Sequence, residues 1–112
     1  MKKVVEFLQE NPVQYLATVS LDGKAKCRPF MFSFEKDGKL WFNTGNFKEV
    51  YKELQANPYV QISVSSPTYQ WIRLSGKAVF VDDKAIKEAA LENPIVKGNY
   101  KNADNPAFEV FY

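Results

Sequence analysis

Two Asp-Gly pairs limit most strongly what this chain can fold into. Asp22-Gly23 and Asp37-Gly38 each lie between segments with strand-like patterns, and Asp-Gly is a preferred sequence for the two-residue turn of a β-hairpin. A hairpin joins neighbouring strands in antiparallel fashion. The sequence therefore predicts an antiparallel sheet that begins with strands at residues 15–20, 25–34 and 39–44.

Three more strands are expected later in the chain. Residues 59–65 alternate apolar and polar side chains, which places Val60, Ile62 and Val64 on one inner face. Residues 70–81 form a long strand-like segment in which Gly76 predicts a bulge or a corner, and residues 106–112 form the last strand. The six strands predict a mainly β (α+β) domain, closed into a small antiparallel barrel.

Short helices are expected beside these strands. The clearest follows residue 46, where apolar side chains recur at helical spacing at Phe47, Val50, Tyr51 and Leu54. Asn46 is the predicted N-cap of this helix, and Glu49 would complete a capping box. Further helices are expected at residues 2–10 and from an aspartate cap at 82 or 83 to about 92, whereas residues 95–106 are expected to form a loop.

The composition excludes several kinds of site and partner. The chain has 112 residues, enough for one domain over 1–112, with one cysteine, no histidine and a net charge of +2. Without histidine, a Ser-His or Cys-His nucleophile pair and a His-ligated metal are excluded. Cys27 cannot form an internal disulfide, and we expect it to be a small buried residue in a protein of the reducing cytoplasm. The small charge argues against a nucleic-acid partner.

No apolar run approaches the roughly 20 residues of a membrane span, and no secretory signal begins the chain. We therefore expect no membrane partner. The chain ends at Tyr112 within a strand-like segment, so we expect either a longer natural protein or a cut at this point.

A possible phosphate pocket lies where the strand at 39–44 leads into the helix. The first N–H groups of a helix and its dipole favour an anion. Lys48, expected about two residues into the helix, is unfavourable there unless an anion is present, and Lys52 follows one turn later on the same face. Together with Arg28 these side chains predict a phosphate site. The alternative is an ordinary pair of solvated lysines.

The only two arginines, Arg28 and Arg73, both fall within predicted strands. A half-buried arginine needs an anionic partner, which is either a carboxylate of the protein or a ligand phosphate. Trp71 lies on the same strand face as Arg73, and the pair suits a planar, phosphorylated ligand. Trp71 could equally belong to the core or to a dimer interface. A second copy is also predicted because one barrel face cannot bury all of Phe30, Phe32, Phe34, Trp41 and Phe42.

The order of several motifs resembles the pyridoxamine 5'-phosphate oxidase-like FMN-binding split-barrel family. These motifs are Arg-Pro-Phe at 28–30, Trp-Phe-Asn-Thr at 41–44, the Lys48 helix that ends at Asn57-Pro58, and Ile-Arg-Leu-Ser-Gly-Lys-Ala at 72–78. The sequence is more similar to the small general-stress and nitroimidazole-resistance-related branch than to the oxidase itself. The resemblance covers most of the chain.

This resemblance implies an antiparallel six-stranded split β-barrel with short flanking helices. It also implies a homodimer with FMN at the interface and flavin-dependent oxidoreductase activity on a small-molecule substrate. By position, the cofactor-binding residues along the flavin ring and ribityl chain would be Arg28, Pro29, Phe30 and Met31, with Asn43 and Thr44 at the ring or ribityl hydroxyls. Lys48 would bind the phosphate with Arg28 and Lys52. Trp71 would lie where the second subunit reaches across, Arg73 would approach the same cofactor, and Gln61 is a weaker candidate.

Two departures limit this reading. No histidine exists and no arginine follows Arg73, so the oxidase's C-terminal substrate-binding motif has no counterpart and pyridoxamine phosphate oxidation is not expected. The histidine associated with some nitroimidazole reductases is absent as well, and no side chain stands out as a catalytic acid or base. Three alternatives stay open: a non-catalytic flavin-binding or sensing module, a deazaflavin-dependent reductase, and a dimeric barrel without cofactor in which Arg28 and Lys48 pair with carboxylates.

Overall fold

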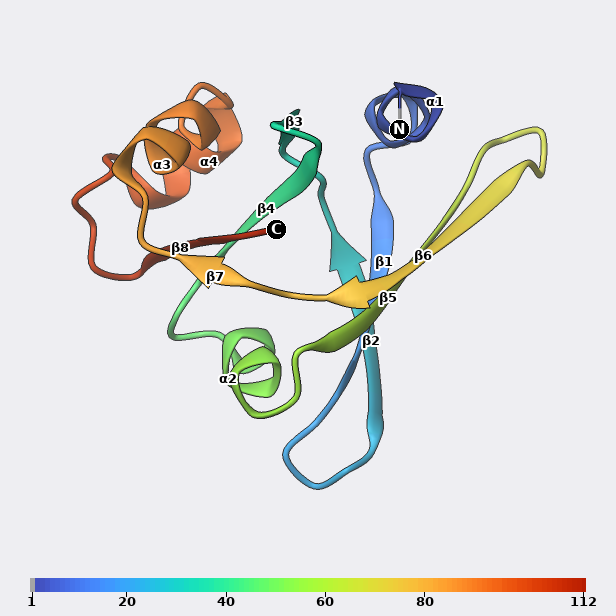
Figure 1. Cartoon of the computed structure of the whole chain (residues 1–112), viewed down its shortest axis with the longest axis horizontal. Coiled ribbons are helices and arrows are strands. Elements are labelled where there is room, and N and C mark those ends of the chain that lie inside the picture. Colours follow the sequence, from blue (N-terminus) through green and yellow to red (C-terminus); the bar gives the residue numbers. More distant parts are fainter. Residues whose placement is uncertain (1) are drawn as a thin grey trace.

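The computed structural model describes residues 2–112, which form two four-stranded antiparallel sheets (Figure 1). The first sheet has the strand order β2-β1-β5-β6 and consists of β1 (Gln14–Val19), β2 (Ala25–Phe30), β5 (Tyr59–Ser65) and β6 (Trp71–Lys77). The second has the order β3-β4-β8-β7 and consists of β3 (Phe34–Lys36), β4 (Lys39–Gly45), β7 (Phe80–Val81) and β8 (Phe108–Phe111).

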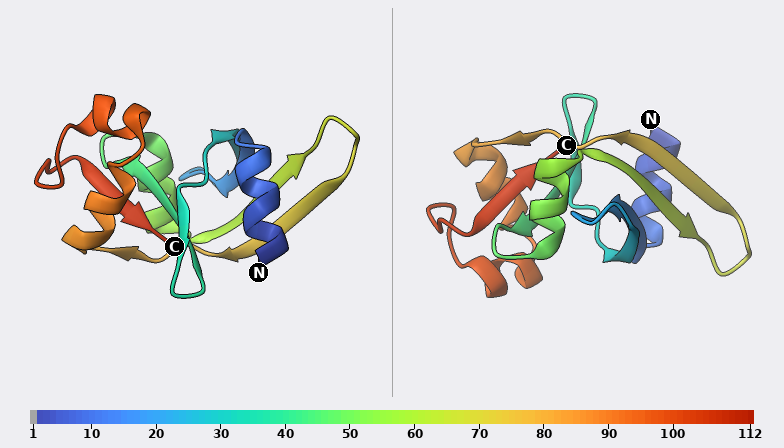
Figure 2. Two further views of the ribbon diagram at one scale, coloured as in Figure 1. Left: turned by 90° about the horizontal axis from the view of Figure 1, so that it is seen from above. Right: turned by 90° about the horizontal axis from the view of Figure 1, so that it is seen from below.

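Four helices surround the sheets: α1 (Lys2–Glu10), α2 (Glu49–Ala56), α3 (Lys84–Ala90) and α4 (Pro94–Tyr100). Helices α3 and α4 lie together beside the second sheet, α1 lies near the first sheet, and α2 lies between the end of β4 and the start of β5 (Figures 1 and 2). The β5–β6 hairpin projects away from the rest of the molecule in all views.

The predicted mainly β, antiparallel fold is confirmed, but the number of strands is eight instead of six. Two predicted strands, at 25–34 and 70–81, are each divided between the sheets. The chain leaves the first sheet after Phe30 and enters the second at Phe34, and it crosses again between Lys77 and Phe80. The apolar pattern continues across both crossings, because a run of extended residues does not show where the neighbouring strand changes. Pro29 lies in the edge strand β2, where a residue without an N–H donor is tolerated.

The expectation of a loop at 95–106 is wrong for its first half, which forms α4. Asn93-Pro94 follows the predicted end of the preceding helix at about 92, and it starts the next helix. The Asn93 side chain accepts a hydrogen bond from Ile95 N at 2.9 Å, and Pro94 occupies the first turn, where its missing N–H is not needed. Asp83 caps α3 as predicted, accepting from Ala85 N and Ile86 N.

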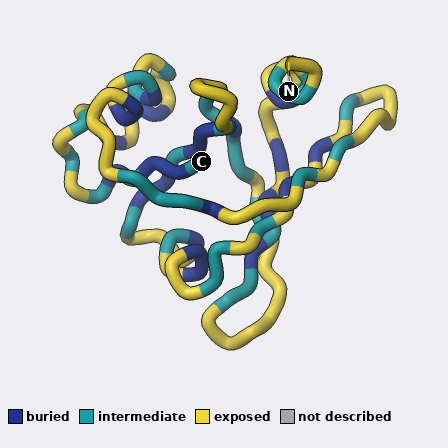
Figure 3. The backbone as a smooth tube through the Cα atoms, viewed as in Figure 1, coloured by how far each residue is buried: buried dark blue, intermediate teal, exposed yellow. Residues whose placement is uncertain are grey.

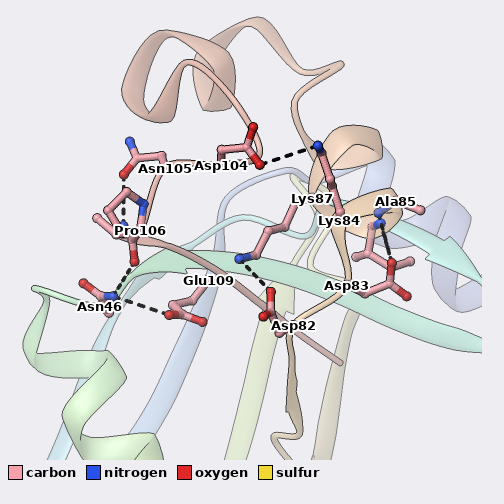
Figure 4. A network of polar contacts seen from close by, with 12 residues as sticks. Asn46, Asp82, Asp83, Lys84, Ala85, Lys87, Asp104, Asn105, Pro106 and Glu109 are labelled. Carbon is pink, nitrogen blue, oxygen red and sulfur yellow. Dashed lines mark hydrogen bonds and ion pairs between the residues drawn. The ribbon is translucent and has the colours of Figure 1, made fainter.

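The predicted start of the middle helix is also wrong, because Lys48 and not Asn46 is the N-cap residue of α2. The side chain of Asn46 instead donates to Pro106 O at 2.7 Å (Figure 4). Its backbone N donates to Ala107 O at 2.8 Å. Phe47 therefore lies outside the helix and is 66% exposed, whereas Val50 and Leu54 are buried as expected. Asn46 ties the β4–α2 connection to the segment before β8.

Two apolar clusters form the core. Figure 3 marks the buried positions of the backbone in dark blue. The larger cluster fills the space between the sheets and includes one buried residue from α1 and two from α2. Its members are Leu8, Leu16, Phe32, Phe42, Val50, Leu54, Ile62, Val64, Ala78 and Phe111. The second cluster lies between the second sheet and the helices α3 and α4, and consists of Trp41, Ile86, Ala90, Val96, Tyr100, Phe108 and Val110.

The side chain of Gln14 holds the first crossing between the sheets in place. It is 1% exposed, donates to Leu8 O at 3.0 Å and Asn11 O at 2.6 Å, and accepts from Phe32 N at 2.7 Å. Two of these groups are carbonyls at the end of α1 and beyond it, and the third is an N–H of the crossing segment. Gln14 thus supplies hydrogen bonds to buried backbone groups that have no partner within a strand or helix.

Replacing Gln14 by leucine should therefore destabilise the fold. Leucine keeps most of the volume but leaves three backbone groups without their partner, so we expect the free energy of unfolding to fall by about 2–4 kcal/mol. Urea denaturation followed by tryptophan fluorescence measures this loss. The matched control is Gln9→Leu on the exposed face of α1, expected to change stability by less than about 0.5 kcal/mol. Equal losses in the two variants would contradict the assigned role.

Candidate functional site

Arg28 points inward from β2 and forms an ion pair with Glu53 of α2. Its Nη2 donates to Glu53 Oε1 at 2.7 Å, and its Nη1 donates to Thr18 Oγ1 at 2.8 Å and Leu16 O at 3.2 Å. Thr18 Oγ1 in turn donates to the same Glu53 oxygen at 2.7 Å, which closes a triangle of three side chains. The side chain of Glu53 is 4% exposed and that of Arg28 is 25% exposed. The sequence left open whether the anionic partner of Arg28 is a carboxylate of the protein or a ligand phosphate. In the structure, Arg28 has a carboxylate partner, that of Glu53.

Glu53 was missed by the sequence analysis, although a signal for it exists. It stands three residues after Val50 and next to Leu54, so it falls on the buried stripe of the helix. A carboxylate on an apolar stripe needs a cationic partner, and Arg28 was the one arginine predicted near the start of this helix. The ion pair holds α2 against the β1–β2 hairpin.

The connection from β4 to α2 is flanked by an unsatisfied hydroxyl, on Thr44 of β4, and an unpaired lysine, the N-cap residue Lys48. Thr44 is 1% exposed, and its Oγ1 has no hydrogen-bond partner within residues 2–112. The turn after it closes with Lys48 N donating to Gly45 O at 3.1 Å. Lys48 is exposed and makes no ion pair with the described part of the chain. Asn43, one residue earlier on β4, donates from Nδ2 to Ser33 Oγ at 2.7 Å.

A polar cleft of about 380 Å³ lies between α2 and the β1–β2 hairpin. Lys52 lines it together with Lys26, and the carboxylates of Asp22, Glu49 and Glu53 face the same space. Lys48 does not line this cleft, so the two helix lysines do not converge on one enclosed pocket. The mixed charges give the cleft no clear preference for an anion.

The outer face of the first sheet carries a second group of predicted residues. A shallow groove of about 610 Å³ crosses this face, and its lining includes Ala17, Val19, Ala25, Tyr59, Gln61, Ser75 and Lys77. Further along β6, Trp71 is 62% exposed and the guanidinium carbon of Arg73 lies 5.9 Å from its ring centroid. The prediction that Trp71 and Arg73 share one face is confirmed.

The remaining predicted residues follow the path of β2 toward the crossing. Pro29 is exposed opposite Tyr15, Phe30 is half-buried with its ring centroid 6.2 Å from that of Phe42, and Met31 is half-buried in the crossing segment. Because strand residues alternate between faces, Arg28 lies on the inner face of the first sheet, whereas Gln61 and Arg73 lie on the outer face. One chain therefore does not bring all the predicted residues together.

Cys27 is exposed, which corrects the expectation of a buried cysteine. It pairs with Ala17 in the ladder of β1 and β2, on the same outer face as Pro29. The physical reason is again alternation: the inward side chain of Arg28 turns its neighbour Cys27 outward.

Tyr69 and Tyr100, whose hydroxyls could in principle face a substrate, are not well placed for this within one chain. Tyr100 is 5% exposed inside the second cluster, where burial raises the pKa of its hydroxyl above the usual value. Tyr69 is 88% exposed, at the tip of the β5–β6 hairpin. The part of the chain that the structure covers contains no cluster of three or more metal-ligating side chains and no helix long and apolar enough to cross a membrane.

Comparison with known proteins now identifies the family. The model of the family "Pyridoxamine 5'-phosphate oxidase" matches residues 1–111. The chain belongs to this family. None of the curated proteins compared with it is significantly similar in sequence.

Solved structures share the fold over nearly the whole chain. A NimC/NimA family protein from Clostridium acetobutylicum is 39% identical, with a TM-score of 0.89 over 100% of this chain and 78% of that one. A putative pyridoxamine 5'-phosphate oxidase from Listeria innocua is 28% identical, with a TM-score of 0.77 over 98% and 88%. General Stress Protein 26 from Bacillus anthracis is 22% identical, with a TM-score of 0.81 over 98% and 84%. The resemblance read from the motifs is thus confirmed.

More distant structures show that the same fold is used with other cofactors. One is named F420 reductase and is 23% identical with a TM-score of 0.68, covering 95% of this chain and 87% of that one. Another is HutZ, named as the haem storage protein of Vibrio cholerae, 18% identical with a TM-score of 0.75 over 98% and 85%. At these identities the likeness concerns the fold alone.

Replacing Arg28 by leucine would leave the carboxylate of Glu53 buried without its counter-charge. We expect the free energy of unfolding to fall by about 2–4 kcal/mol, somewhat less than for a fully buried pair because Arg28 is partly exposed. Chemical denaturation measures the loss. Arg73→Leu, the exposed arginine on β6, is the matched control and should cost less than about 1 kcal/mol. A small effect at both positions would show that the pair contributes nothing.

Proposed function

We propose that this protein binds FMN at the interface of a homodimer and acts as a flavin-dependent oxidoreductase on a small molecule. The proposal rests on two polar side chains without partners near the start of α2. A buried Thr44 hydroxyl without a protein partner and an unpaired Lys48 flank one turn there, in a chain matched by the oxidase family model over residues 1–111. These residues fit a phosphorylated, polyhydroxylated ligand, which supplies both hydrogen-bonding groups and negative charge.

The phosphate is assigned to Lys48 and the free N–H groups of the first turn of α2. A lysine at this position opposes the helix dipole, and a bound dianion would remove that conflict. Lys52 adds a second positive charge one turn later, although it lies in a cleft with three carboxylates. Arg28 contributes less, because three of its N–H donors are already bonded to the protein. Thr44 would bond a ribityl hydroxyl.

The flavin ring is assigned to the segment from Pro29 to Met31 and to the side-chain oxygen of Asn43, whose Nδ2 is bonded to Ser33. Gln61, Trp71 and Arg73 of a second copy would complete the site, because in one chain they lie on the opposite face of the sheet from Arg28. The exposed aromatic rings of Tyr59 and Trp71, at 66% and 62%, support burial against a second copy.

A bound flavin supplies the hydride or electron transfer, and the chain holds and orients it. No histidine is present, and neither Cys27 nor a carboxylate is placed as an acid or base, so catalytic residues are not assigned. We propose no nucleic-acid or membrane partner, and the cytoplasmic location stays a prediction. The substrate is a small molecule other than pyridoxamine phosphate, since the oxidase's substrate motif is missing.

The names of the fold relatives suggest two alternative cofactors, a deazaflavin and haem. A deazaflavin would use the same phosphate site and is the alternative cofactor. Haem is less well supported, because this chain offers no histidine as an axial ligand. A non-catalytic flavin-binding module would keep the same site and lack turnover.

The visible absorption spectrum of the purified protein, before and after added FMN, tests the proposal. We expect a flavin spectrum at one FMN per chain, and sedimentation of the loaded protein as a dimer. Titration with F420 under the same conditions tests the deazaflavin alternative, and oxidation of NAD(P)H with an acceptor separates an enzyme from a binding module. A protein that takes up neither cofactor would overturn the proposal and leave a dimeric barrel without cofactor.

Replacing Lys48 by alanine should weaken FMN binding specifically at the phosphate. We expect a loss of about 1.5–3 kcal/mol in binding free energy, the range of a charge-assisted contact. Quenching of flavin fluorescence during titration gives the dissociation constant. Lys97→Ala on the exposed side of α4 is the control and should leave binding unchanged. Unchanged affinity in Lys48→Ala would remove this lysine from the site.

A further inference from the structure

Glu53 places a negative charge on α2 and directly against Arg28. Its carboxylate belongs to α2, the helix whose first turn is assigned to the phosphate, and its Oε1 lies 2.7 Å from Arg28 Nη2. The side chain is 4% exposed, so solvent screens this charge poorly. The pair carries no net charge, which makes Arg28 a weaker attractor for an anion than an unpaired arginine would be.

The hydrogen bonds of Arg28 show what is left for a ligand. A guanidinium has five N–H donors, and three of the Arg28 donors are bonded to Leu16 O, Thr18 Oγ1 and Glu53 Oε1. Nε and one hydrogen of Nη2 have no partner within residues 2–112. The guanidinium is therefore held in place with a free edge, and a quarter of the side chain remains accessible.

We propose that Glu53 is a specificity-determining residue of the cofactor site: it competes with the flavin phosphate for Arg28 and so lowers the preference for FMN over riboflavin. This inference rests on the proposed function. Riboflavin lacks the phosphate but has the same ring and ribityl chain. The ratio of the two dissociation constants therefore isolates the phosphate contribution.

Glu53→Gln changes the charge with the least change in shape. The glutamine side-chain oxygen still accepts from Thr18 and Arg28, so the triangle and the position of α2 are kept. The variant leaves the positive charge of Arg28 uncompensated and removes the repulsion between the carboxylate and a phosphate dianion. We expect FMN to bind about tenfold more tightly while riboflavin binding stays unchanged.

The experiment measures FMN and riboflavin affinities by fluorescence titration for the unchanged protein, Glu53→Gln and Glu88→Gln. Glu88 is an exposed glutamate of α3 without an ion pair in the described structure, so its variant has the same net charge change far from Arg28. A rise in the riboflavin-to-FMN ratio of dissociation constants in Glu53→Gln alone supports the inference. An unchanged or lower ratio, or an equal rise in Glu88→Gln, overturns it.

A double variant, Arg28→Met with Glu53→Gln, keeps the inference testable if the single variant folds poorly. It removes both charges, so no unpaired ion remains in the interior. Without Arg28 the Glu53→Gln change frees no cation, so we expect the riboflavin-to-FMN ratio of dissociation constants not to rise above that of the unchanged protein. A rise in the double variant would show that Glu53 acts without Arg28 and would overturn the inference. A tenfold fall in this ratio would show that Arg28 attracts the phosphate in the unchanged protein as strongly as an unpaired arginine, despite Glu53, and would overturn the inference. If the unchanged protein bound neither flavin, the proposed function itself would fail, and this inference with it.

Discussion

The structure depends on two crossings at which the chain passes from one sheet to the other without a helix between. At each crossing the backbone must leave one ladder, bridge a few residues and join another ladder, while its polar groups stay paired. Gln14 serves the first crossing by accepting from Phe32 N, and at the second Ala78 N donates to Pro58 O at 2.8 Å while Val79 exchanges backbone hydrogen bonds with Tyr112. The shared apolar cluster can form because these crossings bring the inner faces of both sheets together.

Local patterns predicted the elements that depend on neighbours in sequence. Both expected hairpins form: Asp37-Gly38 is a two-residue turn with positive φ at both residues, whereas Asp22-Gly23 lies in the longer connection 20–24 with positive φ at Gly23. The inward series Val60, Ile62 and Val64 follows from alternation alone. Local patterns did not predict three features: the strand breaks, the start of α2 and the helix after Asn93. Asn46 illustrates the reason: as a cap it would serve its own helix, but the distant Pro106 and Ala107 provide partners for it instead.

The candidate site shows the same division between local and distant information. The residue types around the start of α2 were recognisable from the sequence, and the structure adds the unsatisfied Thr44 hydroxyl to them. What the sequence could not specify was the partner of Arg28, because a carboxylate 25 residues away and a ligand phosphate satisfy the same requirement for an anion. Nor could it show that Arg28 and Arg73 face opposite sides of the first sheet, since this depends on which face the core occupies.

The ion pair between Arg28 and Glu53 resolves a conflict between folding and binding. An arginine directed inward would destabilise a ligand-free chain, because a desolvated charge without a partner is costly. Glu53 provides that partner within the chain, so α2 can dock on the β1–β2 hairpin before any anion arrives. In the proposed site the same carboxylate would oppose a phosphate at the start of the helix, so stability of the free protein would be gained at the expense of phosphate affinity. Lys48 makes no such pair: it is exposed, so its charge costs little in the free protein. In the proposed site it would meet the phosphate with its full charge.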